Sequence, residues 1–285
     1  MDRIIFGDNQ FFAVNHMSDE KSRAQAMRFK DTQSIMAVLD YVYDIGIRTF
    51  MCTTHDRIAD ICDHIRSNPG RYDRFKMYPC MPYAHKYNNA VAELGVIGAL
   101  QKMLPGNVIG SITRGGFALV RKDYINIMKL LIDAEMKMFQ GIETGVIFLQ
   151  NIVVDLILGI GMTDFFVAFS AYVREKYNAE PGFITMNMPL LVNVLEAHGI
   201  ENPIICSSIN KIAFRMPGGK DLYEKTILEK KFRPIAMQSL AAGAIKPREA
   251  MEYVCGQKNI VSILFGASTA AHIKQTKDII DELSH

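Results

Sequence analysis

Short apolar runs alternate with longer amphipathic segments along most of the chain. Eight of these runs have the length and apolar content of buried strands, and they span residues 4–7, 49–53, 77–81, 146–150, 183–187, 204–208, 235–239 and 262–265. Helical patterns separate them, which is typical of parallel strands joined by helical crossovers. Because eight such units close a barrel, the pattern predicts an α/β fold consisting of a (β/α)8 TIM barrel.

A ninth apolar run, residues 107–112, lies between the third and fourth predicted strands and precedes Arg114 and two glycines. We interpret it as part of an insertion, and Arg114 is a candidate substrate residue because a guanidinium group binds carboxylate or phosphate at two points. No linker rich in proline, glycine or serine divides residues 1–285, so one domain is expected. The apolar breadth of residues 94–177 favours a homodimer face or a lid, or else a well-buried crossover helix.

The composition narrows the class of protein. A hydrophobic fraction of 49% suits a globular core, and a net charge of +2 gives no broad basic field for nucleic acid. The N-terminus has no signal-peptide pattern, and Gln150, Asn151 and Asp155 interrupt the apolar stretch 145–161, so no membrane span is expected. We therefore expect a cytoplasmic protein that acts on a small-molecule substrate.

The five cysteines are scattered and lie mostly in apolar runs, which is typical of buried, reduced thiols. A metal site would have to take ligands from the acidic and histidine residues near the first three strand ends. Few strand ends are acidic, so no metal is predicted.

In a barrel the reactive side chains lie at the carboxyl ends of the strands. The first strand is followed by Asp8, Asn9 and Gln10, and His16 comes shortly after them. Polar side chains behind a buried strand lose hydration unless they bind a ligand or one another. These four residues are therefore candidates for substrate binding, and the alternative is a turn in which Asp8 and Asn9 bond neighbouring amides.

The second strand ends in residues suited to proton transfer. His55 and Asp56 follow it directly, where an imidazole can act as acid or base and a carboxylate can fix its tautomer. Both are candidate catalytic residues. The alternative is structural, with Thr54 or Asp56 capping the helix that follows.

The third strand leads to the densest set of ionisable groups in the chain. Tyr83, His85 and Lys86 follow it, and all three are candidate catalytic residues. The structural alternative is that Tyr83 packs on the barrel rim while Lys86 is solvated.

Two strand ends near the C-terminus break at small residues. The first break is the run Ser239, Leu240, Ala241, Ala242 and Gly243, and the second is Gly266, Ala267, Ser268 and Thr269 before a helix. Small residues let the amides of a helix start approach an anion, which the helix dipole also favours. The alternative is an ordinary helix capped by Ser268 or Thr269.

These two segments resemble the last two strands of the aldo/keto reductases, which hold the phosphates of NADP. A strand ending at Asn187 is similar to another strand of that family, so the resemblance covers about the last third of the chain. It implies a barrel that uses NADP as cofactor, with the nicotinamide near Asn187. The implied cofactor-binding residues are Asn187, Ser239, Leu240, Gly243, Gly266, Ala267, Ser268 and Thr269.

The usual catalytic tetrad of that family is absent. The position of its Asp falls at Met51, and no His follows the fourth strand, which ends instead in Gln150 and Asn151. The resemblance therefore implies a rearranged site drawn from the catalytic candidates named above. In it, His55 or Tyr83 exchanges the proton with the substrate oxygen and Lys86 steadies the developing charge.

Three functions stay open at this point. The first is NADP-dependent oxidation or reduction of a small carbonyl or hydroxyl metabolite. The second is a lyase, aldolase or isomerase that acts without a nicotinamide on a phosphorylated or carboxylated metabolite, with His55, His85 or Lys211 for the chemistry. The third is a barrel without catalysis that serves as a subunit or binding module.

Overall fold

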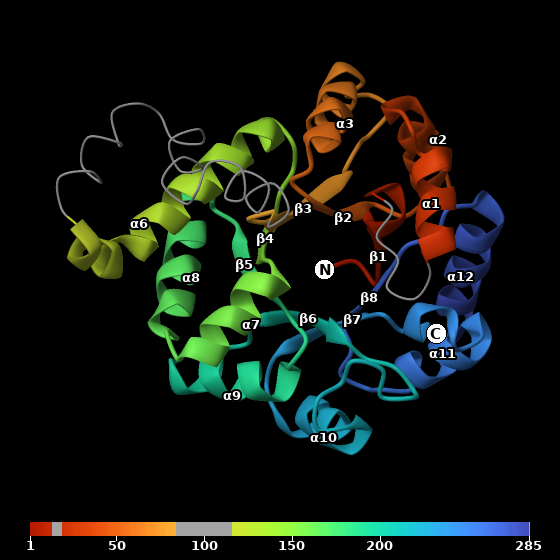
Figure 1. Ribbon diagram of the computed structural model, residues 1–285. Coiled ribbons are helices and arrows are strands. Elements are labelled where there is room, and N and C mark those ends of the chain that lie inside the picture. The colour runs from red at the N-terminus through yellow and green to blue at the C-terminus, as the bar shows by residue number, and fades with distance from the viewer. Residues whose placement is uncertain (13–18, 84–115, 285) are drawn as a thin grey trace.

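A computed structural model describes residues 1–12, 19–83 and 116–284, and its eight parallel strands close a barrel in sequential order (Figure 1). The strands are β1 (Ile4–Gly7), β2 (Thr49–Thr53), β3 (Lys76–Met81), β4 (Val146–Leu149), β5 (Glu180–Thr185), β6 (Ile204–Ser208), β7 (Arg233–Met237) and β8 (Ser262–Phe265). The expected (β/α)8 TIM barrel is confirmed.

Helices surround this barrel (Figure 1). The α-helices of the described ranges are α1 (Asp19–Arg28), α2 (Thr32–Asp44), α3 (Asp56–Ser67), α6 (Gly116–Met136), α7 (Asn151–Ile160), α8 (Asp164–Tyr177), α9 (Met188–Ala197), α10 (Lys220–Glu229), α11 (Pro247–Cys255) and α12 (Ala270–Leu283). Short 3-10 helices are η1 (Asn9–Phe12), η2 (Lys137–Phe139) and η3 (Ala241–Gly243).

Two strands begin at least two residues earlier than the apolar pattern predicts, and β3 begins one residue earlier, at Lys76. β5 starts at Glu180 and β7 at Arg233, and each contains a proline near its start, a residue that usually argues against a strand. The Arg233 guanidinium donates to the Glu180 carboxylate, with Nη1 3.0 Å from Oε1, so the starts of these strands are joined across β6. Because β5 ends at Thr185 and β7 at Met237, the predicted ends at 187 and 239 were wrong.

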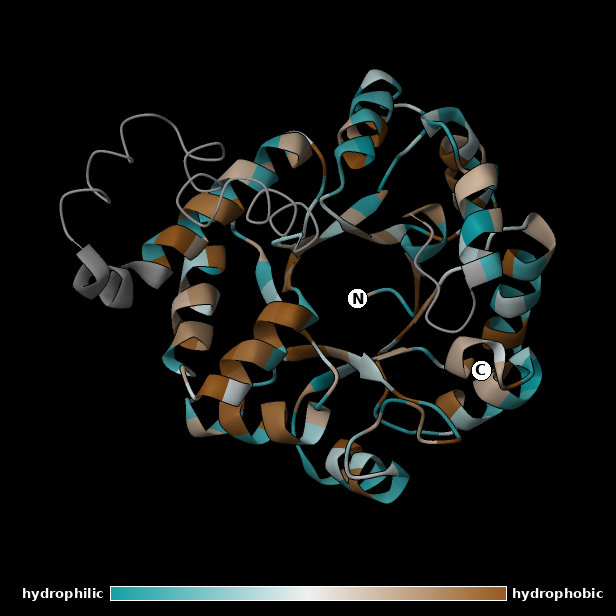
Figure 2. Cartoon of the chain, in the orientation of Figure 1, coloured by the Kyte–Doolittle hydropathy of each residue, from teal (hydrophilic) through white to brown (hydrophobic). Residues whose placement is uncertain are grey.

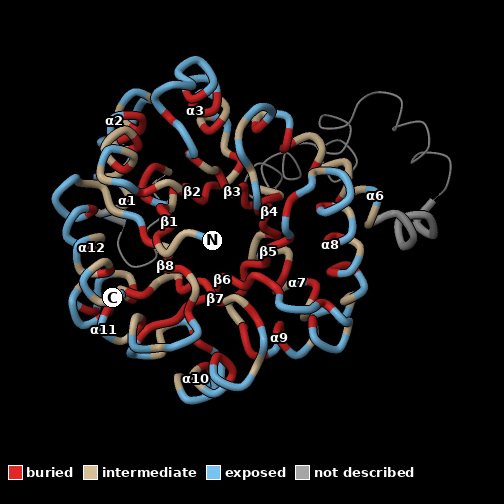
Figure 3. The backbone as a smooth tube through the Cα atoms, turned by 180° about the vertical axis from the view of Figure 1, so that it is seen from behind, coloured by how far each residue is buried: buried red, intermediate tan, exposed pale blue. Residues whose placement is uncertain are grey.

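The alternation of side chains along each strand builds two cores. One set points into the barrel and consists of Ile5, Met51, Tyr78, Cys80, Val146, Phe148, Ile184, Ile204, Cys206 and Ile235. The neighbouring residues, such as Phe6 and Phe50, pack outward against the helices. Seen from behind, the strands are buried and the outer faces of the helices are exposed (Figure 3).

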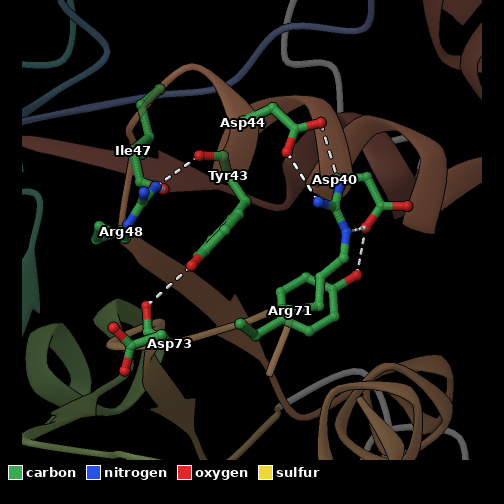
Figure 4. A network of polar contacts seen from close by, with 8 residues as sticks. Asp40, Tyr43, Asp44, Ile47, Arg48, Arg71 and Asp73 are labelled. Atoms are coloured by element: carbon green, nitrogen blue, oxygen red, sulfur yellow. Dashed lines mark hydrogen bonds and ion pairs between the residues drawn. The ribbon is translucent and has the colours of Figure 1, made fainter. Parts of the chain in front are cut away.

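A polar network joins elements at the amino ends of the strands (Figure 4). The Arg48 guanidinium lies 3.9 Å from the ring centroid of Tyr43, and the Tyr43 hydroxyl donates to the Asp73 carbonyl oxygen at 3.2 Å. Arg71 donates to both carboxylate oxygens of Asp44, at 3.0 and 3.1 Å. These contacts tie the end of α2 to the segments that lead into β2 and β3. They stabilise the end of the barrel opposite the strand ends that carry the candidate site.

The connection between β3 and β4 is the longest between consecutive strands, which confirms the expected insertion. Its described helix α6 packs on α8, where Asp133 accepts hydrogen bonds from the Tyr172 hydroxyl at 2.6 Å and the Tyr177 hydroxyl at 2.5 Å. Lys176 Nζ also lies 2.5 Å from this carboxylate. Burial alone would raise the pKa of Asp133, but the bonds from Lys176 and the two tyrosines lower it. Asp133 therefore anchors the insertion as an ionised group.

Helix α7 is apolar along most of its length (Figure 2). Ile152, Leu156 and Ile160 recur at every fourth position and are 48%, 58% and 56% exposed. Asp155, the one charged residue of α7, is half-buried and accepts a hydrogen bond from Thr185 at 2.5 Å. The apolar breadth expected in this region is thus partly on the surface, and the homodimer stays a prediction. Within the described ranges, no helix is long and apolar enough to cross a bilayer.

Candidate active site

Asp8 follows β1 and is a buried acidic residue of the barrel mouth, with 6% of its surface exposed. Its Oδ2 accepts hydrogen bonds from the Thr53 amide and the Thr53 hydroxyl, both at 2.7 Å. Burial raises the pKa of Asp8, although the bonds from Thr53 act in the opposite direction. The side chain of Asp8 therefore joins the ends of β1 and β2. Its carboxyl group releases a proton less readily than an exposed carboxyl group does.

His55 follows β2 and caps helix α3 with its own ring. Its Nδ1 accepts a hydrogen bond from the Arg57 amide at 3.1 Å, so in this geometry the neutral ring carries its proton on Nε2. The ring also stacks on Phe12, with centroids 4.2 Å apart and planes inclined by 18°. The prediction that Thr54 or Asp56 caps helix α3 is wrong, because His55 is the N-cap residue. Asp56 is exposed as the first residue of α3.

Tyr83 lies just after β3 and faces His55, with ring centroids 5.9 Å apart. Burial raises the pKa of Tyr83, and the negative charges of Asp8 and Asp56 raise it further. The phenol is therefore protonated at neutral pH and is suited to donate a proton or a hydrogen bond.

Glu135, near the end of α6, joins the second and third strand ends and was missed from the sequence. Its Oε2 accepts from the Thr54 hydroxyl at 2.6 Å, and its Oε1 accepts from the Tyr83 amide at 3.2 Å. Only 3% of Glu135 is exposed. A signal was present in the helical period, because residue 135 falls on the same face of α6 as the buried Met128 and Ile132.

A second polar pair lies across the barrel, at the ends of β6 and β7. The Ser208 hydroxyl donates to Gln238 Oε1 at 2.6 Å. Gln238 has a φ of 54°, a left-handed conformation that is strained for a residue with a side chain. This pair was not predictable, since nothing in the local residue pattern indicates a left-handed conformation at Gln238.

The predicted cofactor residues near β5 and β7 lie in the segments that follow these strands. Asn187 caps α9, and its Oδ1 accepts from the Leu190 amide at 3.4 Å. Ser239 is 3% exposed, and within the described ranges its buried hydroxyl oxygen has no hydrogen-bond partner. Leu240 is half-buried, and Gly243 is exposed with a φ of 94°. These residues adjoin the strand ends, as the sequence predicts.

The loop after β8 is partly covered by Gln10. A Cβ built on Gly266 would lie 2.1 Å from Gln10 Oε1, and Gln10 Nε2 donates to the Gly7 carbonyl oxygen at 2.7 Å. Further along, the Thr269 hydroxyl accepts from the His272 amide at 3.2 Å, which confirms the expected cap of α12. Ala267 and Ser268 are half-buried between these two features.

The structure thus brings Asp8, His55 and Tyr83 into one region, together with the missed residues Thr53 and Glu135. Asn9 is exposed on η1. Four predicted site residues lie outside the described ranges: His16, His85, Lys86 and Arg114.

Two other candidate groups are unsuited to covalent chemistry. Lys211 is exposed and bonds Glu249 at 2.8 Å, which is the opposite of the buried setting that activates a Schiff-base lysine. Burial raises the pKa of the Cys52 thiol and that of the Cys80 thiol well above the usual value for cysteine. Both therefore stay protonated and unreactive as nucleophiles, as expected from the sequence. Among the residues that the structure describes, no three His, Cys, Asp or Glu side chains converge as a metal site.

No protein-family model matches the chain, and no curated protein matches its sequence. Solved structures do match it over its whole length. An aldo-keto reductase from Bacillus halodurans, in its holo form, gives a TM-score of 0.58 at 9% identity and covers 99% of this chain and 92% of its own.

An aldo/keto reductase from Brucella melitensis gives a TM-score of 0.53 at 10% identity, over 100% of this chain and 94% of its own. A protein assigned as a sugar phosphate isomerase/epimerase, from Anabaena variabilis, gives a TM-score of 0.52 at 6% identity, over 99% of both chains. At such identities the likeness establishes the fold, and the chain therefore has a TIM barrel like that of the aldo-keto reductases.

Proposed function

We propose that this protein is an NADP-dependent oxidoreductase that interconverts a small carbonyl compound and the corresponding alcohol at the barrel mouth. The observation that carries the proposal is the phenol of Tyr83. It is kept protonated by burial and by Asp8, and it lies beside His55 at the strand ends where barrel enzymes do their chemistry. A carbonyl reductase needs such a donor for the substrate oxygen.

The start of α12 fits the phosphate of a nucleotide cofactor. Thr269 uses its hydroxyl to cap the helix, and the amides of Ala270 and Ala271 belong to an exposed first turn, where the helix dipole favours an anion. Ser268 precedes this turn. Gly266 is exposed, but Gln10 Oε1 lies where its Cβ would be, so we leave Gly266 out of the cradle. We therefore assign phosphate binding to Ser268, Thr269 and the first turn of α12.

The proton chemistry belongs to this chain's own residues. NADPH, when bound, supplies the hydride that reduces the carbonyl carbon. Tyr83 donates its phenolic proton to the carbonyl oxygen, which becomes the hydroxyl of the alcohol. His55 can donate a second hydrogen bond through Nε2, because its Nδ1 is already an acceptor for the Arg57 amide.

Asp8 supports the proposal by supplying a carboxylate close to where the resemblance implies one. The implied position is Met51, which is buried inside the barrel and pairs with Gly7 on β1. Asp8 follows Gly7 directly and bonds Thr53, two residues beyond Met51. The carboxylate thus comes from the neighbouring strand, and its charge opposes ionisation of Tyr83.

A second candidate is an isomerase or lyase that acts on a phosphorylated metabolite without a nicotinamide. Two observations favour it: the barrel of the assigned sugar phosphate isomerase/epimerase is similar along its whole length, and Gln10 narrows the approach to Gly266. In that reaction Asp8 would take a proton from the substrate carbon and Tyr83 would protonate the oxygen.

Cofactor binding separates the two candidates. NADPH and NADH are titrated into the protein and followed by the rise in cofactor fluorescence and by thermal shift. If the protein is an oxidoreductase, NADPH should bind saturably with a Kd in about the micromolar range. Ser268→Glu should raise that Kd at least about tenfold, since a carboxylate at this position repels the phosphate. Gln275→Glu adds the same charge at an exposed position of α12 and should bind like the parent protein. No binding at about millimolar cofactor rejects the oxidoreductase, and sugar phosphates are then tested.

A further inference from the structure

Glu135 connects two parts of the candidate site that come from different strands. Its two carboxylate oxygens accept separate hydrogen bonds, one from the Thr54 hydroxyl at 2.6 Å and one from the Tyr83 amide at 3.2 Å. Thr54 directly precedes His55, and Tyr83 is the phenol that faces it. The carboxylate therefore bridges the backbone segments that present both rings.

The bridge is buried, which makes it stiff. Glu135 is 3% exposed and Thr54 is fully buried. The Thr54 contact, at 2.6 Å, has the length of a well-formed hydrogen bond from a hydroxyl to a carboxyl oxygen. Water has little access to compete for these bonds, and a neutral amide in place of the carboxylate can accept only through one oxygen.

Helix α6 holds Glu135 in place from its other side. Asp133 lies two residues earlier, which turns it about 200° around the helix axis from Glu135. It bonds the Tyr172 and Tyr177 hydroxyls of α8 at 2.6 and 2.5 Å. One face of α6 is thus fixed to α8 while the opposite face reaches the barrel mouth.

His55 and Tyr83 each need this support for a different reason. The His55 ring is oriented by the Arg57 amide and by Phe12, but the position of its backbone depends on the end of β2. Tyr83 lies beyond the end of β3, where no strand pairing holds it, and its amide is bonded to Glu135. The same carboxyl group therefore contacts the segments that carry both rings, whose centroids lie 5.9 Å apart.

We propose that Glu135 is a positioning residue that fixes Tyr83 relative to His55, so that the insertion between β3 and β4 contributes a working part of the active site. The catalytic consequence rests on the proposed function, but the positioning itself is a structural property. It can be measured without a substrate.

The test uses NMR of the full chain with ring-labelled tyrosine and histidine. Tyr83→Phe and His55→Gln assign the two ring signals. Glu135→Gln removes one acceptor, Thr54→Val removes one donor, and Glu143→Gln makes the same chemical change at an exposed residue of the same connection. We expect Glu135→Gln to shift or broaden both ring signals, Thr54→Val to affect chiefly that of His55, and Glu143→Gln to leave both unchanged.

Unchanged Tyr83 and His55 signals in folded Glu135→Gln overturn the proposal. Should that variant fail to fold, Thr54→Val decides, and an unchanged His55 signal then overturns it. Once a carbonyl substrate is known, Glu135→Gln should lower kcat about tenfold or more with little change in KM, because misplacement by an ångström can cost about a hundredfold. Failure of NADPH to bind would reject the proposed reaction while leaving the NMR result intact.

Discussion

The side-chain oxygen of Gln10 occupies the space that a Cβ on Gly266 would need. The two would lie 2.1 Å apart, far inside van der Waals contact. Gln10 is 4% exposed and donates to the Gly7 carbonyl oxygen at 2.7 Å, so it cannot move away without losing that bond. The absence of a side chain at position 266 is thus explained within the protein itself, by contact between the loops after β1 and β8.

Gly266→Ala should therefore destabilise the protein by about 1–3 kcal/mol, the usual cost of overfilling a packed position. Gly145→Ala is the control, since a Cβ there meets nothing within 4 Å. Chemical unfolding measures both. In a Gln10→Ala background the cost of Gly266→Ala should largely disappear, and an undiminished cost would show that the contact is not its cause.

Gly182 on β5 gives a sharper packing prediction inside the barrel. Its Cβ would lie 2.5 Å from Cδ1 and Cε1 of Phe148, which is fully buried on β4. Gly182→Ala should cost at least about 1–3 kcal/mol in the free energy of unfolding. Gly159→Ala, on the exposed side of α7 with nothing within 4 Å, should instead stabilise by about 0.5–1 kcal/mol. Similar effects at both positions would contradict this description of the barrel interior.

Asp8 should make the parent protein lose stability relative to Asp8→Asn as the pH rises. Its pKa is raised by burial above the ordinary 3.8, so only well below that pH are the carboxyl groups of both the folded and the unfolded state neutral. As the pH rises through the folded pKa, the unfolded state has already released its proton, and folding carries the cost of a buried charge. Urea unfolding from about pH 4 to about pH 7 should show the gap widening in favour of Asp8→Asn.

Asp44 is the control for this pH profile because its pKa shift has the opposite sign. The hydrogen bonds of Arg71 lower the pKa of Asp44, so its contribution to stability is present above the ordinary pKa and is lost as the pH falls. Asp44→Asn should therefore approach the parent in stability toward low pH. A parallel profile for the two variants would mean that burial does not govern Asp8.

Tyr83→Phe tests the proton donor. It should lower kcat by about 10²–10⁴-fold, the usual contribution of a positioned general acid, while the Kd of NADPH changes little. Tyr253→Phe removes a hydroxyl that bonds Glu224 at 2.9 Å on the outside of the barrel and should leave kcat unchanged. Steady-state kinetics on a carbonyl found by screening gives both values. Full activity of Tyr83→Phe would assign the proton transfer to another group.

The strand pattern was predictable because strands buried on both faces appear in the sequence as short, nearly continuous apolar runs. Four of the strands, β1, β2, β6 and β8, have the predicted bounds, whereas β5 and β7 begin at charged and proline residues that apolar patterns omit. The site was only partly predictable. Asp8, His55 and Tyr83 lie within two residues of strand ends, where functional residues of a barrel are expected. Glu135 lies on helix α6, and a local sequence pattern does not indicate which strand ends that helix contacts.

The bridge through Glu135 limits how far this barrel can be treated as a set of interchangeable units. A chimera that replaces the connection between β3 and β4 with a short turn from another barrel would keep all eight strands and every pairing in the sheet. It would nevertheless remove the carboxylate that Thr54 and Tyr83 share. The proposed role of Glu135 therefore predicts that recombination of barrel parts has to move the segment from Tyr83 to Glu135 as one block.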